Sequence, residues 1–200
     1  MDLEGRRFFL SSYCDFAQDH DVHGPYHDHE YGFPIDDEAK LFERLLLEIN
    51  QAGLSWELIL KKREGFRKAY DGFNVDRVAA YGEEDRSRLL GDPGIIRNRL
   101  KVGAAISNAR VIQSMRASHG GFDDWIRAHH PLPKIEWVKL FKKTFKFTGG
   151  EITNEFLMSI GYLPCPHRED CPVYQKIVAL SPPWMEVEPE YYRPTKRKNT

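Results

Sequence analysis

The chain has 200 residues, of which 41% are hydrophobic and 30% are charged, and its formal net charge is -1. This composition excludes an intrinsically disordered protein and indicates one globular domain with a full hydrophobic core. No segment reaches the roughly 20 apolar residues of a membrane span, and the charged N-terminus is followed by no apolar run. Three cysteines cannot form a closed disulfide set, which argues against a secreted scaffold. We therefore expect a cytoplasmic protein with no membrane partner.

Helix signals follow one another along the chain, whereas strand signals are scarce. Apolar spacing and flanking Asp, Asn, Gly and Pro residues predict helices over 37–50, 55–70, 74–81, 83–90, 95–118, 123–128, 135–143 and 151–160. The expected fold class is all-α. We expect a single helical domain over 1–180 and a loosely ordered C-terminal tail over 181–200.

The corner between the first two predicted helices combines a carboxylate, a glycine turn and a tryptophan. Glu48 lies beside the apolar stripe of the first helix, Gly53 is expected to end that helix, and Ser55 is expected to cap the next one. Trp56 then falls in the first turn of the second helix. Such a pair suits a flat polar ligand, but a plain corner with a solvated Glu48 and a core Trp56 is equally compatible with the segment alone.

A basic stretch covers 93–121, which contains no acidic residue. Its bases are Arg97, Arg99, Lys101, Arg110 and Arg116. Residues 89–99 resemble a helix-hairpin-helix, in which a tight turn at Gly94 and the following helix N-terminus can bind a DNA phosphate. A plain helical hairpin with a solvated basic face is the alternative for this segment taken alone.

Cysteine and histidine residues near the two ends of the chain form a candidate metal set. Cys14 and His27 lie near the N-terminus, and His167 and Cys171 lie near the C-terminus. Two thiolates and two imidazoles suit a tetrahedral zinc ion, and a complete ligand set is typical of a structural site. Buried free cysteines and surface histidines are the alternative from spacing alone. Cys165 is expected to be a spare thiol.

Several blocks together resemble the 3-methyladenine DNA glycosylase I family. They are Tyr26-His27-Asp28-His29-Glu30-Tyr31-Gly32, Leu41-Phe42-Glu43, the Glu48 to Trp56 stretch, Ile59-Leu60-Lys61-Lys62-Arg63, the Gly94 to Lys101 stretch and Phe145-Lys146-Phe147. The resemblance implies a helix-hairpin-helix DNA glycosylase-like helical bundle whose N- and C-terminal segments are joined by one structural Zn²⁺. It further implies monofunctional excision of 3-methyladenine with a water nucleophile.

The resemblance also implies roles for individual residues. Glu48 would be the catalytic carboxylate that reads the flipped base, and Trp56 and Tyr26 would bind that base. The turn at Gln51, Gly53 and Leu54 would enter the duplex, while the hairpin residues Gly94, Arg97, Arg99 and Lys101 would contact DNA. The metal ligands would be Cys14, His27, His167 and Cys171. The implied partner is double-stranded DNA with alkylated bases, bound by a monomer that associates with the nucleoid when acting.

The chain departs from the family pattern around the base pocket. Phe16 and Tyr31 occupy positions where Trp is common, and His23 replaces an aromatic Tyr; we expect all three to bind substrate. Glu155 stands where a small polar residue is expected, so a second carboxylate would approach the base or face solvent. Three alternatives remain open: the same fold with a shifted preference among alkylated bases, a catalytically silent module that binds damaged DNA, and a zinc-stapled helical interaction protein.

Overall fold

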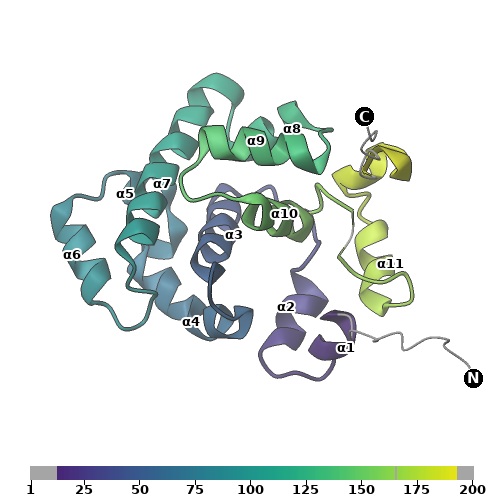
Figure 1. Ribbon diagram of the computed structural model, residues 1–200, viewed down its shortest axis with the longest axis horizontal. Coiled ribbons are helices and arrows are strands. Elements are labelled where there is room, and N and C mark those ends of the chain that lie inside the picture. Colours follow the sequence, from purple (N-terminus) through teal and green to yellow (C-terminus); the bar gives the residue numbers. More distant parts are fainter. Residues whose placement is uncertain (1–12, 165, 193–200) are drawn as a thin grey trace, which may run out of the picture.

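The structure is a computed structural model that describes residues 13–164 and 166–192. All regular structure in these ranges is helical (Figure 1), which confirms the expected all-α class. The α-helices are α1 (Tyr13–Ala17), α2 (His23–His29), α3 (Glu38–Gln51), α4 (Trp56–Ala69), α5 (Val75–Ala79), α6 (Glu83–Gly91), α7 (Arg99–His119), α8 (Phe122–His129), α9 (Lys134–Thr144), α10 (Gly150–Ser159) and α11 (Pro172–Val178). Short 3₁₀ helices cover Asp71–Phe73, Pro183–Glu186 and Pro189–Tyr192.

Helix α3 is the central element of the fold. Its N-cap Asp37 accepts a hydrogen bond from the Lys40 backbone N–H, and every residue from Leu41 to Asn50 is buried. It packs against α4, α7, α8 and α10, which surround it in Figure 1. A helix buried on all sides fixes the position of any polar group it carries, and Glu48 is one such group.

Helix α7 is the longest helix, and it begins four residues later than the sequence pattern predicts. Asn98 caps it by accepting hydrogen bonds from the backbone N–H groups of Leu100 and Lys101. Ile95 is buried in the core ahead of this cap, in a non-helical segment. The apolar pair before the cap therefore anchors the loop between α6 and α7, and the prediction of a helix start at position 95 is wrong.

The two ends of the described chain meet at one side of the molecule, where α1 and α2 lie beside α11 (Figure 1). These three helices have five to seven residues each, and the sequence pattern did not predict them. They are too short to show an apolar period. Their packing includes a small cluster of Cys14, Cys171, Val173 and Ile177, separate from the main core.

The segment after α11 packs on the helical body as far as it is described. The Trp184 backbone N–H donates to the Gly161 carbonyl, and the Pro183 carbonyl lies 2.9 Å from His130 Nε2. These bonds attach residues 183 and 184 to the helical body, and residues 193–200 of the expected loosely ordered tail lie outside the described ranges. Among the described residues, no helix combines the length and apolar character needed to cross a membrane.

Candidate functional site

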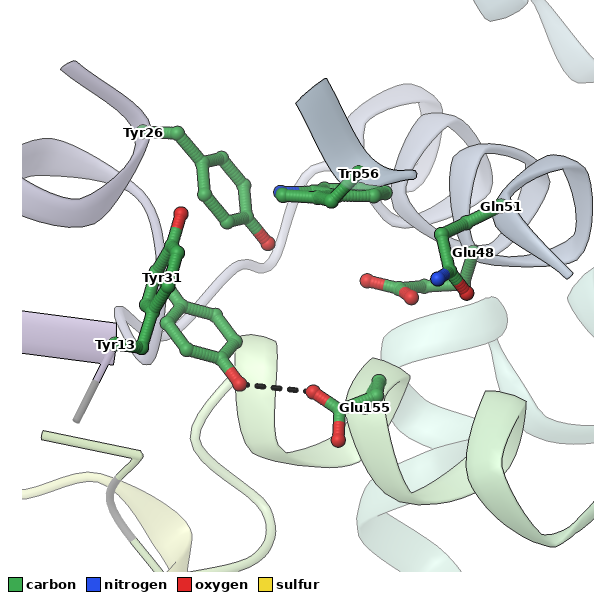
Figure 2. Close-up of a pocket in the computed structure, with 7 residues that line it drawn as sticks. All are labelled: Tyr13, Tyr26, Tyr31, Glu48, Gln51, Trp56 and Glu155. Atoms are coloured by element: carbon green, nitrogen blue, oxygen red, sulfur yellow. Dashed lines mark hydrogen bonds between the residues drawn. The ribbon is translucent and has the colours of Figure 1, made fainter. Parts of the chain in front are cut away.

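A cavity of about 280 Å³ opens between the α1–α2 pair, the α3–α4 corner and α10 (Figure 2). This volume suits one small planar molecule. The lining residues are Tyr13, Tyr26, Tyr31, Glu48, Gln51, Trp56 and Glu155. The segments that contribute them lie far apart in the sequence, and four of the seven side chains are aromatic.

Glu48 presents its carboxylate to this cavity from the last turn of α3. The residue is only 5% exposed. Burial raises the pKa of Glu48 to about 8, the neighbouring Arg44 opposes this rise, and Glu155 adds to it. At neutral pH the empty cavity therefore favours the protonated carboxyl, whereas a bound ring that carries positive charge favours the ionised carboxylate, which accepts hydrogen bonds from that ring.

The aromatic walls face one another at contact distance. Ser55 caps α4 by accepting from the Leu58 backbone N–H, and this cap places Trp56 at the first helical position. The Trp56 and Tyr26 rings lie edge to face with centroids 5.2 Å apart, while Tyr26 stacks on Tyr31 at 5.5 Å. These rings form a box for a flat ligand.

A buried guanidinium holds the Tyr26 wall in place. Arg44 Nη1 donates to the Tyr26 hydroxyl at 2.6 Å, and Nη2 donates to Glu30 at 3.1 Å. The Arg44 Cζ atom also lies 4.7 Å from the Tyr26 ring centroid. Arg63 extends this network, since it bonds both Glu30 and the buried carboxylate of Glu43.

Two expected pocket residues do not line the cavity. Phe16 is 49% exposed, and the centroid of its ring lies 4.9 Å from that of the His23 ring. His23 is buried, and its Nδ1 bonds the Tyr13 hydroxyl at 3.0 Å. Tyr13, which the sequence pattern did not predict as a pocket residue, lies in the wall instead. Spacing along a helix as short as α1 does not show which of its aromatic side chains points into the cavity. Tyr31 lies in the cavity lining, as expected.

The four candidate metal ligands meet in one buried cluster. Cys14 Sγ and Cys171 Sγ each lie 3.8 Å from His167 Nδ1, Cys171 Sγ is also 3.8 Å from His27 Nε2, and the two nitrogens are 3.1 Å apart. A tetrahedral zinc site with ordinary bond lengths has ligand separations of about 3.3 to 3.8 Å. The residues therefore fit a tetrahedral metal ion.

The outward ring nitrogens of both histidines have hydrogen-bond partners. His27 Nδ1 lies 2.7 Å from an Asp28 carboxylate oxygen, and His167 Nε2 lies 2.7 Å from the Tyr31 carbonyl oxygen. Such contacts hold a ligating imidazole in the required tautomer. The group Cys14, His27, His167 and Cys171 can thus hold a metal, while Cys165 lies outside the described residues.

The turn between α3 and α4 projects beside the cavity mouth. Gly53 is exposed at φ = 81°, a left-handed conformation that suits glycine. The Leu54 backbone N–H donates to the Gln51 carbonyl, and Gln51 Nε2 donates back to the Leu54 carbonyl. Leu54 is half-buried against the core. A tight, self-bonded turn of this kind is a rigid projection.

The α6–α7 hairpin presents only part of the basic stretch to solvent. Arg97 and Arg99 are exposed, and neither forms an ion pair with any other described residue. Gly94 packs so closely on Gly65 that a Cβ added at Gly65 would lie 2.4 Å from the Gly94 carbonyl oxygen. The turn is therefore held against α4, with its two arginines directed outward.

The structure contradicts the expected phosphate contact of Lys101. Its side chain is buried, and Nζ donates to the carbonyls of Asn50 at 2.8 Å and Ala52 at 2.7 Å. The ammonium group thus satisfies carbonyl groups at the C-terminus of α3. Arg110 and Arg116 are also engaged, the first with the carbonyls of Ala79 and Tyr81 and the second with acidic side chains. Sequence alone could not separate these inward bases from the outward ones.

An all-helical body with an aromatic cavity and a buried carboxylate defines a class of receptor for flat rings that donate hydrogen bonds. The sequence identifies the family within this class, because the model of the family described as Methyladenine glycosylase matches residues 16–174 of the chain. The chain is 37% identical over 167 residues to "DNA-3-methyladenine glycosylase 1" of Escherichia coli, covering 74% of this chain and 89% of the relative. It is 32% identical over 182 residues to "DNA-3-methyladenine glycosylase" of Haemophilus influenzae, covering 82% and 98%.

Solved structures show the same relationship. A crystal structure of 3-methyladenine DNA glycosylase I superimposes with a TM-score of 0.73 at 36% identity, covering 80% of this chain and 97% of that one. A variant of such an enzyme in complex with 3-methyladenine gives a TM-score of 0.74 at 29% identity, covering 80% and 96%. The chain belongs to the methyladenine glycosylase family.

Proposed function

We propose that this protein is a base-excision repair glycosylase that flips 3-methyladenine out of alkylated duplex DNA and hydrolyses its bond to the sugar. The observation that carries the proposal is the buried carboxylate of Glu48 beside Trp56 and Tyr26, in a chain of this family. A methyl group on N3 makes the adenine ring cationic. Such a ring gains about 0.5 to 2 kcal/mol from each aromatic face and donates its amine to Glu48.

The positive charge also weakens the glycosidic bond, so recognition supplies much of the catalysis. Water attacks C1′ of the sugar, the bond from C1′ to N9 breaks, and its electron pair neutralises the departing base. The proton lost by the water passes to solvent. No enzyme–DNA covalent intermediate forms, and borohydride treatment during turnover would trap no adduct. Neutral adenine lacks the charge attraction, and its glycosidic bond is not weakened.

The decisive test uses Glu48→Gln in single-turnover release of 3-methyladenine from methylated duplex DNA. We expect a loss of about 100-fold or more, because Gln keeps the shape of the side chain but lacks the charge. Glu57→Gln is the matched control: Glu57 neighbours Trp56 but pairs with Lys61 at 2.6 Å and does not line the cavity. Equal rates for the wild type and Glu48→Gln would contradict the assigned role.

Two segments at the surface form the DNA-binding face. The turn of Gln51, Gly53 and Leu54 enters the space that the flipped base vacates, with Leu54 as the wedge between base pairs. The hairpin at Gly94 binds a phosphate through backbone N–H groups, and Arg97 and Arg99 add charge. Leu54→Ala should weaken excision from duplex DNA far more than excision from single-stranded DNA, where no base pair has to be opened. Equal losses on both substrates would exclude the wedge.

One structural zinc ion joins the two ends of the chain, held by the thiolates of Cys14 and Cys171, by His27 Nε2 and by His167 Nδ1. The ligand separations support this assignment. Purified protein should contain about one zinc per chain, and Cys171→Ser should lower both the zinc content and the melting temperature. A metal-free protein of unchanged stability would rule out the clasp.

A further inference from the structure

Glu155 places a second carboxylate in the cavity. It lies on α10, across the cavity from the α3–α4 corner (Figure 2). Its Oε2 atom accepts a hydrogen bond from the Tyr31 hydroxyl at 2.8 Å, and its Oε1 atom accepts one from Asn154 Nδ2 at 3.3 Å. The carboxylate is therefore oriented by two neighbours and is not a freely rotating surface group.

The charge of the cavity lining is unbalanced. Of its seven residues, Glu48 and Glu155 are acidic and none is basic. The guanidinium of Arg44 stands behind the Tyr26 wall, where it bonds the Tyr26 hydroxyl and Glu30. Two acids in a half-enclosed aromatic box favour an occupant with a formal positive charge, and they repel a neutral ring's acceptor atoms.

The two acids do not occupy equivalent positions. In Figure 2 Trp56 is seen edge-on, and the carboxylate of Glu48 lies between the level of Trp56 and the level of Glu155. A ring stacked on Trp56 thus presents its edge to Glu48 and its opposite face to Glu155. A carboxylate beneath a ring face responds to the charge of the ring, whereas a carboxylate at the ring edge responds to the pattern of donors.

On the basis of the proposed function, we propose that Glu155 is a specificity-determining residue that makes this pocket select alkylated purines by their positive charge, so that its substrates include 7-methylguanine as well as 3-methyladenine. The N1–H and N2 amine of 7-methylguanine offer Glu48 two parallel donors, where 3-methyladenine offers its amine. Both bases are cationic in DNA. Hypoxanthine, a neutral purine, gains nothing from Glu155 and is rejected.

The excision test compares release of 7-methylguanine, 3-methyladenine and hypoxanthine from duplex DNA. Glu155→Gln preserves the volume of the side chain and an acceptor for Tyr31, and Glu151→Gln on the exposed surface of the same helix is its control. We expect wild type to release both methylated bases, Glu155→Gln to lose about tenfold on each, and the control to match wild type. Release of 3-methyladenine without 7-methylguanine by wild type would overturn the proposed range.

A binding test separates charge selection from a structural role and from the proposed function itself. Two free ligands are titrated at pH 9: the 3,9-dimethyladeninium cation and neutral 3-methyladenine. Glu155→Gln should weaken binding of the cation about tenfold and leave the neutral ring unchanged. Equal losses for both ligands, or none for the cation, would overturn the role of Glu155. If wild type releases no base from any DNA, the proposed function fails, while this titration still tests charge selection.

Discussion

Ionisation of Glu48 should oppose folding, and the size of this effect can be worked out from the cavity. Burial raises its pKa from 4.5 to about 8, against the opposing effect of Arg44 and with a further rise from Glu155. At pH values between 4.5 and about 8, the Glu48 carboxyl retains its proton in the native state and releases it in the unfolded chain. The stability that the neutral carboxyl contributes is therefore complete below about pH 4.5, and it is lost as the pH rises to about 8, at about 1.4 kcal/mol per pH unit.

Glu48→Gln removes this dependence, because the amide is neutral at every pH. Between pH 6 and pH 8 the wild type should lose about 3 kcal/mol in its free energy of unfolding that the variant does not lose, because the dependence extends over two pH units. For a chain of this size, the melting temperature of the variant should therefore rise relative to that of the wild type by about 6 to 12 °C. Thermal melts of both proteins at pH 6 and pH 9 measure the change, and the titrating groups that do not interact with Glu48 cancel. A difference that stays constant with pH would refute the reasoning.

Three further predictions concern charged residues outside the cavity. Lys101→Met should lower stability by about 1 to 3 kcal/mol in urea titrations, by leaving carbonyl groups unpaired, without changing the salt dependence of DNA binding. Arg99→Ala should leave stability unchanged. If it removes one phosphate contact, a fluorescence titration should show that the slope of the log DNA-binding constant against log salt falls in magnitude by about 0.9. Arg63→Met should cost about 3 to 5 kcal/mol, since it removes the cation shared by Glu30 and the buried Glu43; a loss below 1 kcal/mol would show that Arg67 alone suffices for Glu43.

The helices around the core could be predicted from sequence because the signals that define each helix lie within its own segment. An apolar period and a capping residue, such as Asp37 before α3 and Ser55 before α4, place most boundaries within two residues. The start of α7 is the exception. There the apolar pair before the true cap belongs to a loop anchored in the core, and periodicity cannot distinguish the two cases.

The cavity was only partly predictable, for a different physical reason. Glu48 and Trp56 stand out because their helix is apolar and their turn contains a glycine. Tyr13 and Glu155 become neighbours of this pair only through tertiary packing, which no local pattern records. Phe16 was expected in the wall because resemblance transfers a position along the chain and does not transfer the direction of a side chain.

The cavity has two halves with different physical support. Glu48 and Trp56 come from the α3–α4 corner, whose geometry is fixed by the main hydrophobic core. The tyrosines come from the segment that also carries two of the proposed metal ligands, since Tyr13 directly precedes Cys14 and Tyr26 directly precedes His27. Core packing therefore holds the half with Glu48 and Trp56, and the proposed clasp between the chain ends would hold much of the half with the tyrosines.

A chain of hydrogen bonds connects the clasp to the second carboxylate. His167 Nε2 donates to the Tyr31 carbonyl, and the Tyr31 hydroxyl donates to Glu155. An ion held by all four residues of the proposed clasp would take no part in bond cleavage, yet its loss would release the tyrosine that orients Glu155 while Glu48 stayed fixed in α3. Charge selection would then depend on the clasp, whereas recognition of the ring edge by Glu48 would depend on the core.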